Sequence, residues 1–216
     1  MSKHASGAVA ESTRTILCLV RHGDAGDALA LPEIDALRGL TEKGRRQAQR
    51  VGKALKRLGL EPRDVWVSRL RRAGETAEVA ATTLAFSPRW IATAALAPEA
   101  LPERIAKALL ETPPAPFPSA KGGEERARVQ PKPRRRKGGA AGPAAAKEAA
   151  PVARWVVGHE PHLSRLLGYL TGAPAEALRL PKGSLALVEC DGRGPQAGAC
   201  HLQGLFTPGA LKALRR

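Results

Sequence analysis

Arginine and histidine side chains stand just after three apolar stretches of this chain. Arg21 and His22 follow the first stretch, Arg69, Arg71 and Arg72 come shortly after the second, and His159 follows the third. A guanidinium can hold two phosphate oxygens at once through its forked N–H groups, and an imidazole nitrogen can attack phosphorus as a nucleophile. These residue types at these places indicate phosphoryl-transfer chemistry.

The elements that must position these side chains alternate between strands and helices. Residues 15–20 form an apolar run typical of a buried parallel strand. The next helix, predicted at 42–58, has Thr41 as its N-cap and Gly59 as its C-terminal stop. Further strands are predicted at 65–68, 90–94, 154–157, 184–189 and 200–206, and further helices at 71–84, 98–110 and from Pro161 onward.

This alternation predicts an α/β domain with a mostly parallel sheet. The carboxyl ends of the strands in such a sheet converge on one crevice. We therefore expect a pocket that contains two histidines and at least two arginines, placed where the helix at 71–84 begins.

Four segments in a fixed order carry a family resemblance. They are Arg21-His22-Gly23 and the stretches 40–44, 68–77 and 158–161. In order and spacing the chain resembles the histidine phosphatase superfamily, and it is most similar to the short SixA-type phosphohistidine phosphatases. The resemblance implies a three-layer α/β/α fold of the phosphoglycerate-mutase type.

The resemblance also implies a role for each matching residue. His22 would attack phosphorus through one ring nitrogen and form a phosphohistidine intermediate, which demands a neutral imidazole whose other nitrogen is held by a hydrogen bond. Arg21 and Arg72 would clamp the phosphoryl oxygens, and His159 would donate a hydrogen bond to the same group. Gly23, the last residue of the triplet, is counted with the substrate-binding residues.

Asp35 and Arg38 match an aspartate and an arginine of SixA-like proteins. The resemblance implies a phosphate contact for Arg38, whereas Asp35 either belongs to the substrate-binding site or is a loop carboxylate that pairs with Arg38. The proton donor stays open among Glu160, Asp24 and Asp35. A weak or absent acid suits a phosphohistidine substrate, because a protonated phosphoramidate nitrogen leaves more easily than an alkoxide.

The chain departs from the family pattern at three positions. Arg69 stands where proline is common, Glu75 where glutamine is common, and His162 where small residues are usual. Arg69 and His162 are interpreted either as an extension of the basic rim of the site or as neutral drift. Arg71 is interpreted as a rim or surface residue.

The chain of 216 residues is long enough for one domain with a sizeable core. We expect a disordered tail at 1–14 and a single domain at 15–216, interrupted by a disordered insertion at 112–151. The insertion holds nine Lys and Arg against three Glu, so it contributes +6 to the net charge of +15. Because it is rich in Pro, Ala and Gly, it has too few large apolar side chains to form a hydrophobic core.

The basic insertion supports an alternative function, in which a phosphatase-like domain binds nucleic acid. The stretch lacks the interleaved aromatic residues on which bases stack, so a solvated linker is the favoured interpretation. A small-molecule phosphomonoesterase of the same superfamily is a further alternative. A mutase is less favoured, because the chain lacks the long ordered segments that enclose a bisphosphate in that branch.

No metal, cofactor or membrane span is predicted. Histidine catalysis with arginine clamps needs no cofactor, and the five histidines form no short-spaced ligand set with Cys or Asp. No apolar run approaches the ~18 residues of a membrane span. The chain has three cysteines: Cys18, Cys190 and Cys200. This odd number favours reduced thiols and a cytoplasmic protein. Cys190 and Cys200 could nevertheless face each other across a hairpin. We expect a monomer that acts on a phosphorylated protein or a small phosphate ester.

Overall fold

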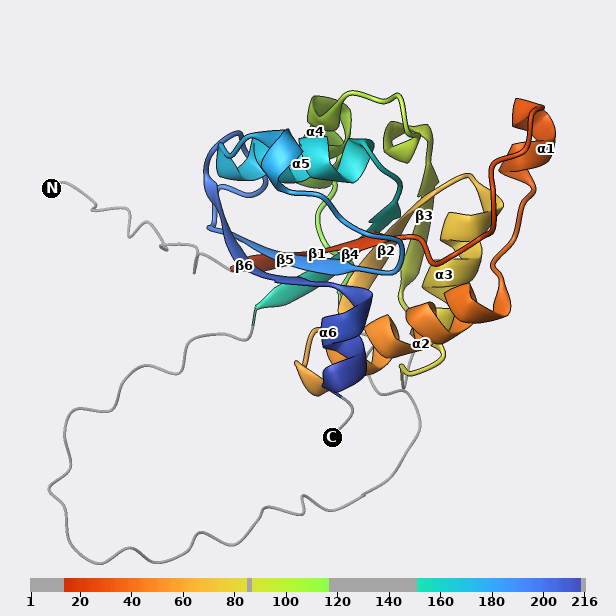
Figure 1. Cartoon of the computed structure of the whole chain (residues 1–216). Helices are drawn as coiled ribbons and strands as arrows, with labels where there is room; N and C mark the ends of the chain where they lie inside the picture. Colours follow the sequence, from red (N-terminus) through yellow and green to blue (C-terminus); the bar gives the residue numbers. More distant parts are fainter. Residues whose placement is uncertain (1–13, 85–86, 117–150, 215–216) are drawn as a thin grey trace, which may run out of the picture.

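A six-stranded sheet runs through the middle of the molecule and carries helices on both faces (Figure 1). The computed structural model describes residues 14–84, 87–116 and 151–214. The strands are β1 (Thr15–Arg21), β2 (Pro62–Ser68), β3 (Arg89–Thr93), β4 (Val152–Gly158), β5 (Leu185–Cys190) and β6 (Cys200–Phe206). The helices are α1 (Pro32–Ala36), α2 (Glu42–Arg57), α3 (Arg71–Ala81), α4 (Pro102–Glu111), α5 (His162–Thr171) and α6 (Pro208–Ala213), with two 3-10 turns, η1 (Ala94–Leu96) and η2 (Ala175–Ala177).

The sheet confirms the predicted α/β class and its mostly parallel character. Its strand order is β3-β2-β4-β1-β5-β6. The four strands from β3 to β1 are parallel, whereas β5 is antiparallel to both β1 and β6. The carboxyl ends of β1, β2 and β4 therefore meet at one edge of the sheet. Because β5 runs the other way, its first residue also lies at that edge, where Leu185 pairs with Val20.

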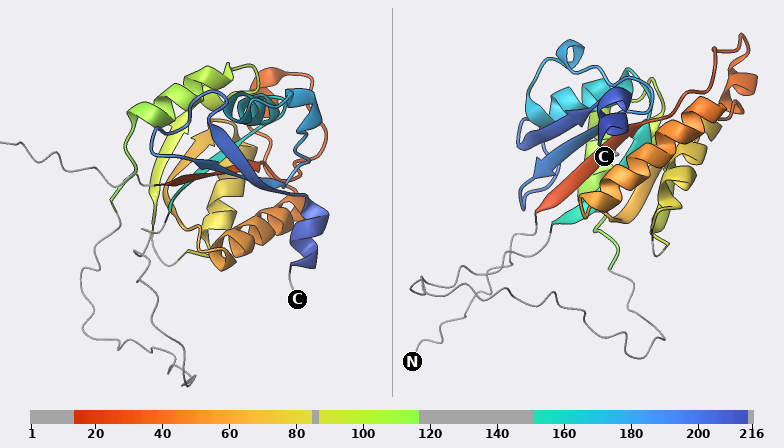
Figure 2. Two further views of the ribbon diagram at one scale, coloured as in Figure 1. Left: turned by 90° about the vertical axis from the view of Figure 1, so that its left-hand side faces the viewer. Right: turned by 60° about the horizontal axis from the view of Figure 1, so that its bottom comes forward.

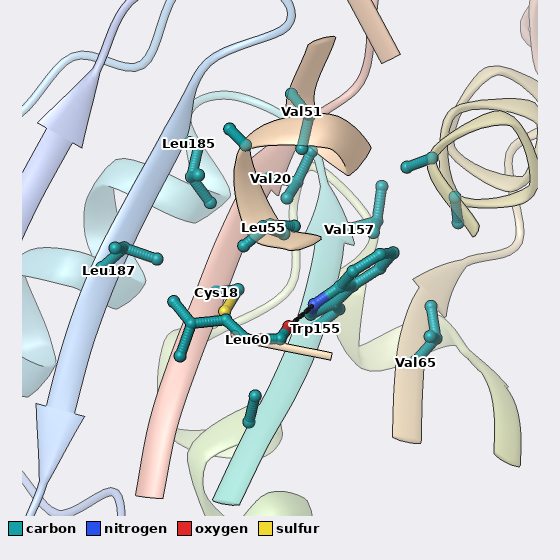
Figure 3. Close-up of a cluster of buried hydrophobic side chains, with 14 of the residues drawn as sticks. Cys18, Val20, Val51, Leu55, Leu60, Val65, Trp155, Val157, Leu185 and Leu187 are labelled. Carbon is teal, nitrogen blue, oxygen red and sulfur yellow. Dashed lines mark hydrogen bonds between the residues drawn. The ribbon is translucent and has the colours of Figure 1, made fainter. Parts of the chain in front are cut away.

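The helices form two outer layers, which confirms the three-layer arrangement. Figure 2 shows α4 and α5 on one face of the sheet and α2, α3 and α6 on the other. Each face has its own apolar core, one centred on Trp155 and the other on the leucines of α5. In the first core the Trp155 indole N–H donates to the Leu60 carbonyl at 2.9 Å (Figure 3). Burial of this side chain thus leaves no unpaired donor.

The best-predicted helix is α2. The Thr41 hydroxyl accepts a hydrogen bond from the Gly44 N–H, as expected of an N-cap, and the helix ends just before Gly59, which has a φ of 67°. Its apolar stripe, including Val51 and Leu55, is buried against the sheet. The N-terminus of α2 is in this way held at a defined place beside the end of β1.

Two helices differ clearly from their predicted bounds, and two short helices were not predicted. The helix expected at 98–110 begins at Pro102, where the fixed φ of proline suits the first turn, and η1 occupies part of the preceding stretch. The helix at 71–84 ends at Ala81. The short α1 and α6 were not predicted, because helices of five and six residues carry too few apolar positions to show a period.

Most of the predicted tail and insertion lies outside the described residues. The described ends of the insertion are tied to the domain: Thr112 caps α4, and the carbonyls of Pro113 and Ala115 accept from Arg89 and Arg63. The expected disorder of 1–14 and 112–151 stays a prediction.

Cys190 and Cys200 face each other, as their positions suggested. They are paired in the register of β5 and β6, and their sulfur atoms are 2.8 Å apart in the core. The expected reduced state of the thiols stays a prediction. Among the described residues no helix has the length and hydropathy needed to cross a membrane.

Candidate active site

The predicted side chains come together at the carboxyl edge of the sheet. Arg21 ends β1 and His22 follows it, His159 follows β4, and Arg72 lies in the first turn of α3. The ring centroids of His22 and His159 are 4.9 Å apart, with their planes tilted by 50°. Residues far apart in sequence thus build one site, as convergence of the strand ends predicts.

His22 is held as a neutral imidazole with one free nitrogen. The ring is 6% exposed, and its Nδ1 lies 2.7 Å from the Gly23 carbonyl. Since a carbonyl only accepts, Nδ1 carries the proton and Nε2 has a free lone pair. Burial lowers the pKa of His22 to about 4, with the bond to Gly23 opposing this shift and the positive charges of Arg72 and Arg21 adding to it.

Two glycines let the loop after β1 touch the start of α2. A Cβ on Gly23 would lie 2.6 Å from the Gly44 carbonyl oxygen, and a Cβ on Gly44 would lie 2.0 Å from the Asp24 carbonyl oxygen. The Gly23 N–H donates to the Thr76 hydroxyl on α3 at 3.0 Å. The backbone that carries His22 is therefore fixed by both neighbouring helices.

Arg21 and Arg72 are each held by a hydrogen bond from Nη1, and each has a buried Nε without a partner among the described residues. Arg21 donates through Nη1 to the Leu180 carbonyl at 2.7 Å, and Arg72 donates through Nη1 to the backbone carbonyl of Asp35 at 2.9 Å, with a carboxylate oxygen of the same residue at 3.1 Å. The Nε atoms of both arginines are buried, and no described residue accepts from them. Burial lowers the pKa of both guanidinium groups.

His159 adds two more buried polar atoms without partners. The residue is 2% exposed, and neither ring nitrogen has a hydrogen-bond partner among the described residues. Burial, together with nearby His22, Arg72 and Arg21, lowers its pKa to about 3. Buried polar groups are almost always paired in folded proteins. Guanidinium and imidazole N–H groups that converge without partners are suited to an anion such as a phosphoryl group.

Asp35 and Arg38 form the ion pair that one interpretation of the sequence anticipated. An Asp35 carboxylate oxygen accepts from Arg38 Nε at 2.8 Å, and the remaining donors of Arg38 include one bonded to the carbonyls of Ala25 and Gly26. Asp35 also holds Arg72, so the pair positions a guanidinium of the site. The predicted contact of Arg38 with phosphate stays a prediction.

The three candidate proton donors are all engaged in hydrogen bonds. Glu160 Oε1 accepts from the Leu180 N–H at 3.0 Å and from the Ser164 hydroxyl at 2.8 Å. The Thr41 hydroxyl bonds to Asp24 and lowers its pKa, and the Leu29 N–H does the same for Asp35. Asp24 and Asp35 are therefore ionised at neutral pH and hold no proton to donate.

Lys182 and Ser184 belong to this edge, although the sequence did not single them out. Lys182 Nζ lies 3.3 Å from an Asp24 carboxylate oxygen and adds to the positive charge that lowers the pKa of His22. The Ser184 hydroxyl is buried and has no partner among the described residues. The only sequence signal was their place directly before a strand, which points to the site only once β5 is known to be antiparallel.

The departures from the family pattern lie in different surroundings. Arg69 and Arg71 are exposed, and Arg71 pairs with Glu75 at 2.7 Å. His162, in contrast, is fully buried and its Nδ1 bonds to the Ala100 carbonyl at 2.8 Å. The interpretation of His162 as part of the basic rim was wrong, because the residue sits on the inward face of α5. Within the described ranges no three His, Cys, Asp or Glu side chains gather as a candidate metal site.

A family model covers the whole of this site. The model of the Histidine phosphatase superfamily (branch 1) matches residues 17–201. That span runs from β1 into β6 and includes every side chain described above.

Several solved structures share the fold. The protein histidine phosphatase SixA complexed with tungstate is 19% identical, has a TM-score of 0.62, and the match covers 91% of this chain and 99% of that one. A putative phosphohistidine phosphatase SixA from Nakamurella multipartitia is 20% identical, with a TM-score of 0.59 and coverage of 90% and 96%. A phosphoglycerate mutase from Plasmodium falciparum is 16% identical, with a TM-score of 0.54 and coverage of 89% and 90%. At these identities the likeness establishes the fold.

A sequence relative matches a shorter segment. The mitochondrial serine/threonine-protein phosphatase Pgam5 of Drosophila ananassae is 44% identical over 63 residues, which are 29% of this chain and 21% of that protein. The chain thus matches about a fifth of the length of this relative.

Proposed function

The chain belongs to the histidine phosphatase superfamily, and from that premise we propose that it is a phosphatase with His22 as its nucleophile and phosphohistidine in proteins as its substrate. One observation carries the proposal. The neutral His22 ring, held through Nδ1, keeps a free nitrogen beside buried N–H groups of Arg21, Arg72 and His159 that have no partner among the described residues.

The proposed reaction has two steps. In the first, His22 Nε2 attacks phosphorus, the bond from phosphorus to the leaving nitrogen or oxygen breaks, and a phosphohistidine forms on the enzyme. In the second, water attacks this phosphorus, inorganic phosphate leaves, and the neutral imidazole returns. Arg21, Arg72 and the single N–H of neutral His159 stabilise the phosphoryl oxygens in both steps.

The state of the nearby carboxylates favours a substrate with a good leaving group. Asp24 and Asp35 have lowered pKa values, so neither supplies the proton that an alkoxide leaving group would need. The imidazole of a phosphohistidine leaves as a neutral ring when its other nitrogen, the one not bonded to phosphorus, carries a proton, so the P–N bond breaks without such an acid. The likeness to the structure of the protein histidine phosphatase SixA complexed with tungstate is consistent with this choice.

The test compares two substrates and two variants. Wild-type protein, His22→Ala and the exposed-histidine control His201→Ala are each incubated with a histidine-phosphorylated carrier protein and with p-nitrophenyl phosphate. We expect wild type and His201→Ala to release phosphate from the carrier and His22→Ala to lose about 10⁴-fold or more in kcat. If only the small ester is hydrolysed in a His22-dependent way, the natural substrate is a small phosphate ester and not a phosphorylated protein. Absence of His22-dependent turnover on both would reject the proposal.

A further inference from the structure

A pocket of about 550 Å³ adjoins the candidate active site. It lies between the start of α5 and the segment 175–181, which begins with η2 and precedes β5. Arg21 lines this pocket and also contributes a buried, unpartnered Nε to the active site. Through this shared residue, a group placed in the pocket lies next to a phosphoryl group held by Arg21. The volume is within the range of small-molecule sites.

The walls of the pocket are held in place by hydrogen bonds. The Ser164 hydroxyl lies 2.7 Å from the Leu178 carbonyl and 2.8 Å from Glu160 Oε1, and these two acceptors share its single proton. Glu160 also accepts from the Leu180 N–H. The Leu180 carbonyl in turn accepts from Arg21. The segment before β5 is therefore tied both to α5 and to a guanidinium of the active site. This bonding leaves Glu160 a positioning residue of the pocket wall.

The lining combines apolar surface with unpaired positive charge. Pro161, Ala175, Leu180 and Pro181 form the apolar part. Arg165 and Arg179 also line the pocket, both are exposed, and no side-chain hydrogen bond or ion pair joins either guanidinium to a described residue. Two glutamates line it as well: Glu160 is engaged in the wall as described, and Glu176 is exposed on η2. The lining of the pocket thus contains three arginines and two glutamates, and one of these glutamates is already engaged in hydrogen bonds of the wall.

We propose that this pocket receives the leaving group of the substrate and that Arg165 and Arg179 select leaving groups that carry a carboxylate. The proposal rests on the proposed function of His22. Apolar walls accept the stem of such a group, and a guanidinium pairs with a carboxylate through two parallel hydrogen bonds. The carboxylate belongs either to an acidic residue beside the phosphorylated side chain of a protein or to a small phosphate ester of a carboxylic acid.

The first arm of the test uses two small esters. Hydrolysis of 4-carboxyphenyl phosphate and of its methyl ester is measured for wild type, Arg165→Glu, Arg179→Glu and the control Arg104→Glu, which changes an exposed arginine on α4 outside the pocket. The ratio of the two kcat/KM values is compared between proteins, since this cancels the intrinsic reactivity of each ester. We expect each pocket variant to lower the ratio about three- to tenfold relative to wild type, and Arg104→Glu to keep it. Added salt should shrink the wild-type preference.

The second arm uses two phosphohistidine peptides that differ only in Glu or Gln beside the histidine. A charge-dependent preference for the Glu peptide, without one in the ester pair, supports the inference and assigns the carboxylate to a protein. A preference in both pairs also supports the inference and shows that a small carboxylic acid is enough to be recognised. Ratios in Arg165→Glu, Arg179→Glu and the double variant that equal wild type on both pairs, with turnover still abolished in His22→Ala, would overturn the inference and leave the phosphatase standing. Absence of any His22-dependent turnover would overturn both.

Discussion

The two ends of strand β4 each lie beside buried arginine or histidine side chains, but the hydrogen-bonding capacity of these side chains is largely met at one end and left open at the other. Near the start of the strand Arg154 is 2% exposed, and its Nε donates to the Asp64 carboxylate at 2.9 Å. Asp64 is fully buried and also accepts from the Trp66 indole and from Arg89. Although Nη2 of Arg154 has no partner within the described residues, the charge itself is neutralised. This end is a structural ion pair.

Beyond the other end of β4 several buried nitrogen atoms lack hydrogen-bond partners among the described residues. His159 makes no hydrogen bond through its ring within the described residues, and Arg21 and Arg72 each keep a buried unpartnered Nε. Burial of unpaired polar groups costs free energy, which an anionic ligand can offset. The comparison teaches that burial of a cation is not by itself a sign of function. The informative feature is the gathering of several buried unpartnered nitrogen atoms, from Arg21, Arg72 and His159, at one place.

The largest effect is expected when the buried ion pair between Asp64 and Arg154 is broken. Asp64→Asn leaves Arg154 as an uncompensated buried charge, so we expect the free energy of unfolding to fall by about 3–5 kcal/mol. Urea unfolding measures the change, and kcat/KM on p-nitrophenyl phosphate should be unaffected where the protein is folded. The double variant Asp64→Asn with Arg154→Met should regain part of the loss. A folded Asp64→Asn protein without activity would contradict the division between the two ends.

At the end of β4 beside the candidate active site, loss of an arginine should impair catalysis more than stability. Arg72→Gln removes a proposed phosphoryl contact, and we expect kcat/KM to fall about 10²- to 10³-fold. The adjacent exposed arginine provides a matched control, because Arg71→Gln should leave kcat/KM near the wild-type value. Steady-state kinetics and thermal unfolding of both variants make the test. Equal effects of the two substitutions would argue against Arg72 as part of the site.

The histidines should titrate far below their ordinary range. NMR titration of the folded protein should give a pKa of about 4 for His22 and about 3 for His159, against 6.5 in the unfolded chain. Well above pH 6.5 both are neutral in both states, so they add no pH dependence there. As the pH falls from 6.5 toward 4, the unfolded chain binds protons that the folded protein does not, and stability decreases. Inorganic phosphate should raise both pKa values, because a bound anion favours the protonated rings. Titration of both rings near 6.5 would contradict their burial.

Substitution at a glycine of the loop should have a moderate effect. Gly44→Ala places a Cβ 2.0 Å from the Asp24 carbonyl oxygen, so we expect a loss of about 1–3 kcal/mol in stability and lower kcat, because the His22 loop must shift. Gly74→Ala on α3 is the control, since its Cβ would meet no atom within 4 Å, and it should stabilise the protein by up to about 1 kcal/mol. Thermal unfolding compares them. A neutral Gly44→Ala would show that α2 and the loop can separate without cost.

The smallest expected effect is at Glu160. The amide oxygen of Glu160→Gln can still accept from Ser164 and Leu180, so we expect kcat to fall less than about tenfold, whereas loss of a proton donor costs typically 10²- to 10⁴-fold. Rates are measured with p-nitrophenyl phosphate and the phosphohistidine carrier. A large loss confined to the ester would identify Glu160 as the acid for alkoxide-type leaving groups.

Local signals explain why much of the fold and of the site was predictable. Periods of apolar residues, the Thr41 cap and the glycine after α2 depend on near neighbours in sequence, and they placed the main elements within a few residues. His22 and His159 could be assigned to one crevice because a parallel sheet brings its carboxyl strand ends to one edge. The short α1 and α6 carried no comparable signal.

The sequence by itself determined the α/β class and the four side chains Arg21, His22, Arg72 and His159 that gather at one edge of the sheet. Only the tertiary structure decided which other groups join or leave that edge. It brought Lys182 to Asp24, 158 positions away, paired Arg72 with Asp35, and buried His162 on the inward face of α5, where its ring bonds to the Ala100 carbonyl. The physical reason is that these outcomes depend on the antiparallel direction of β5 and on side-chain contacts between distant loops, and neither is set by residues near them in the chain.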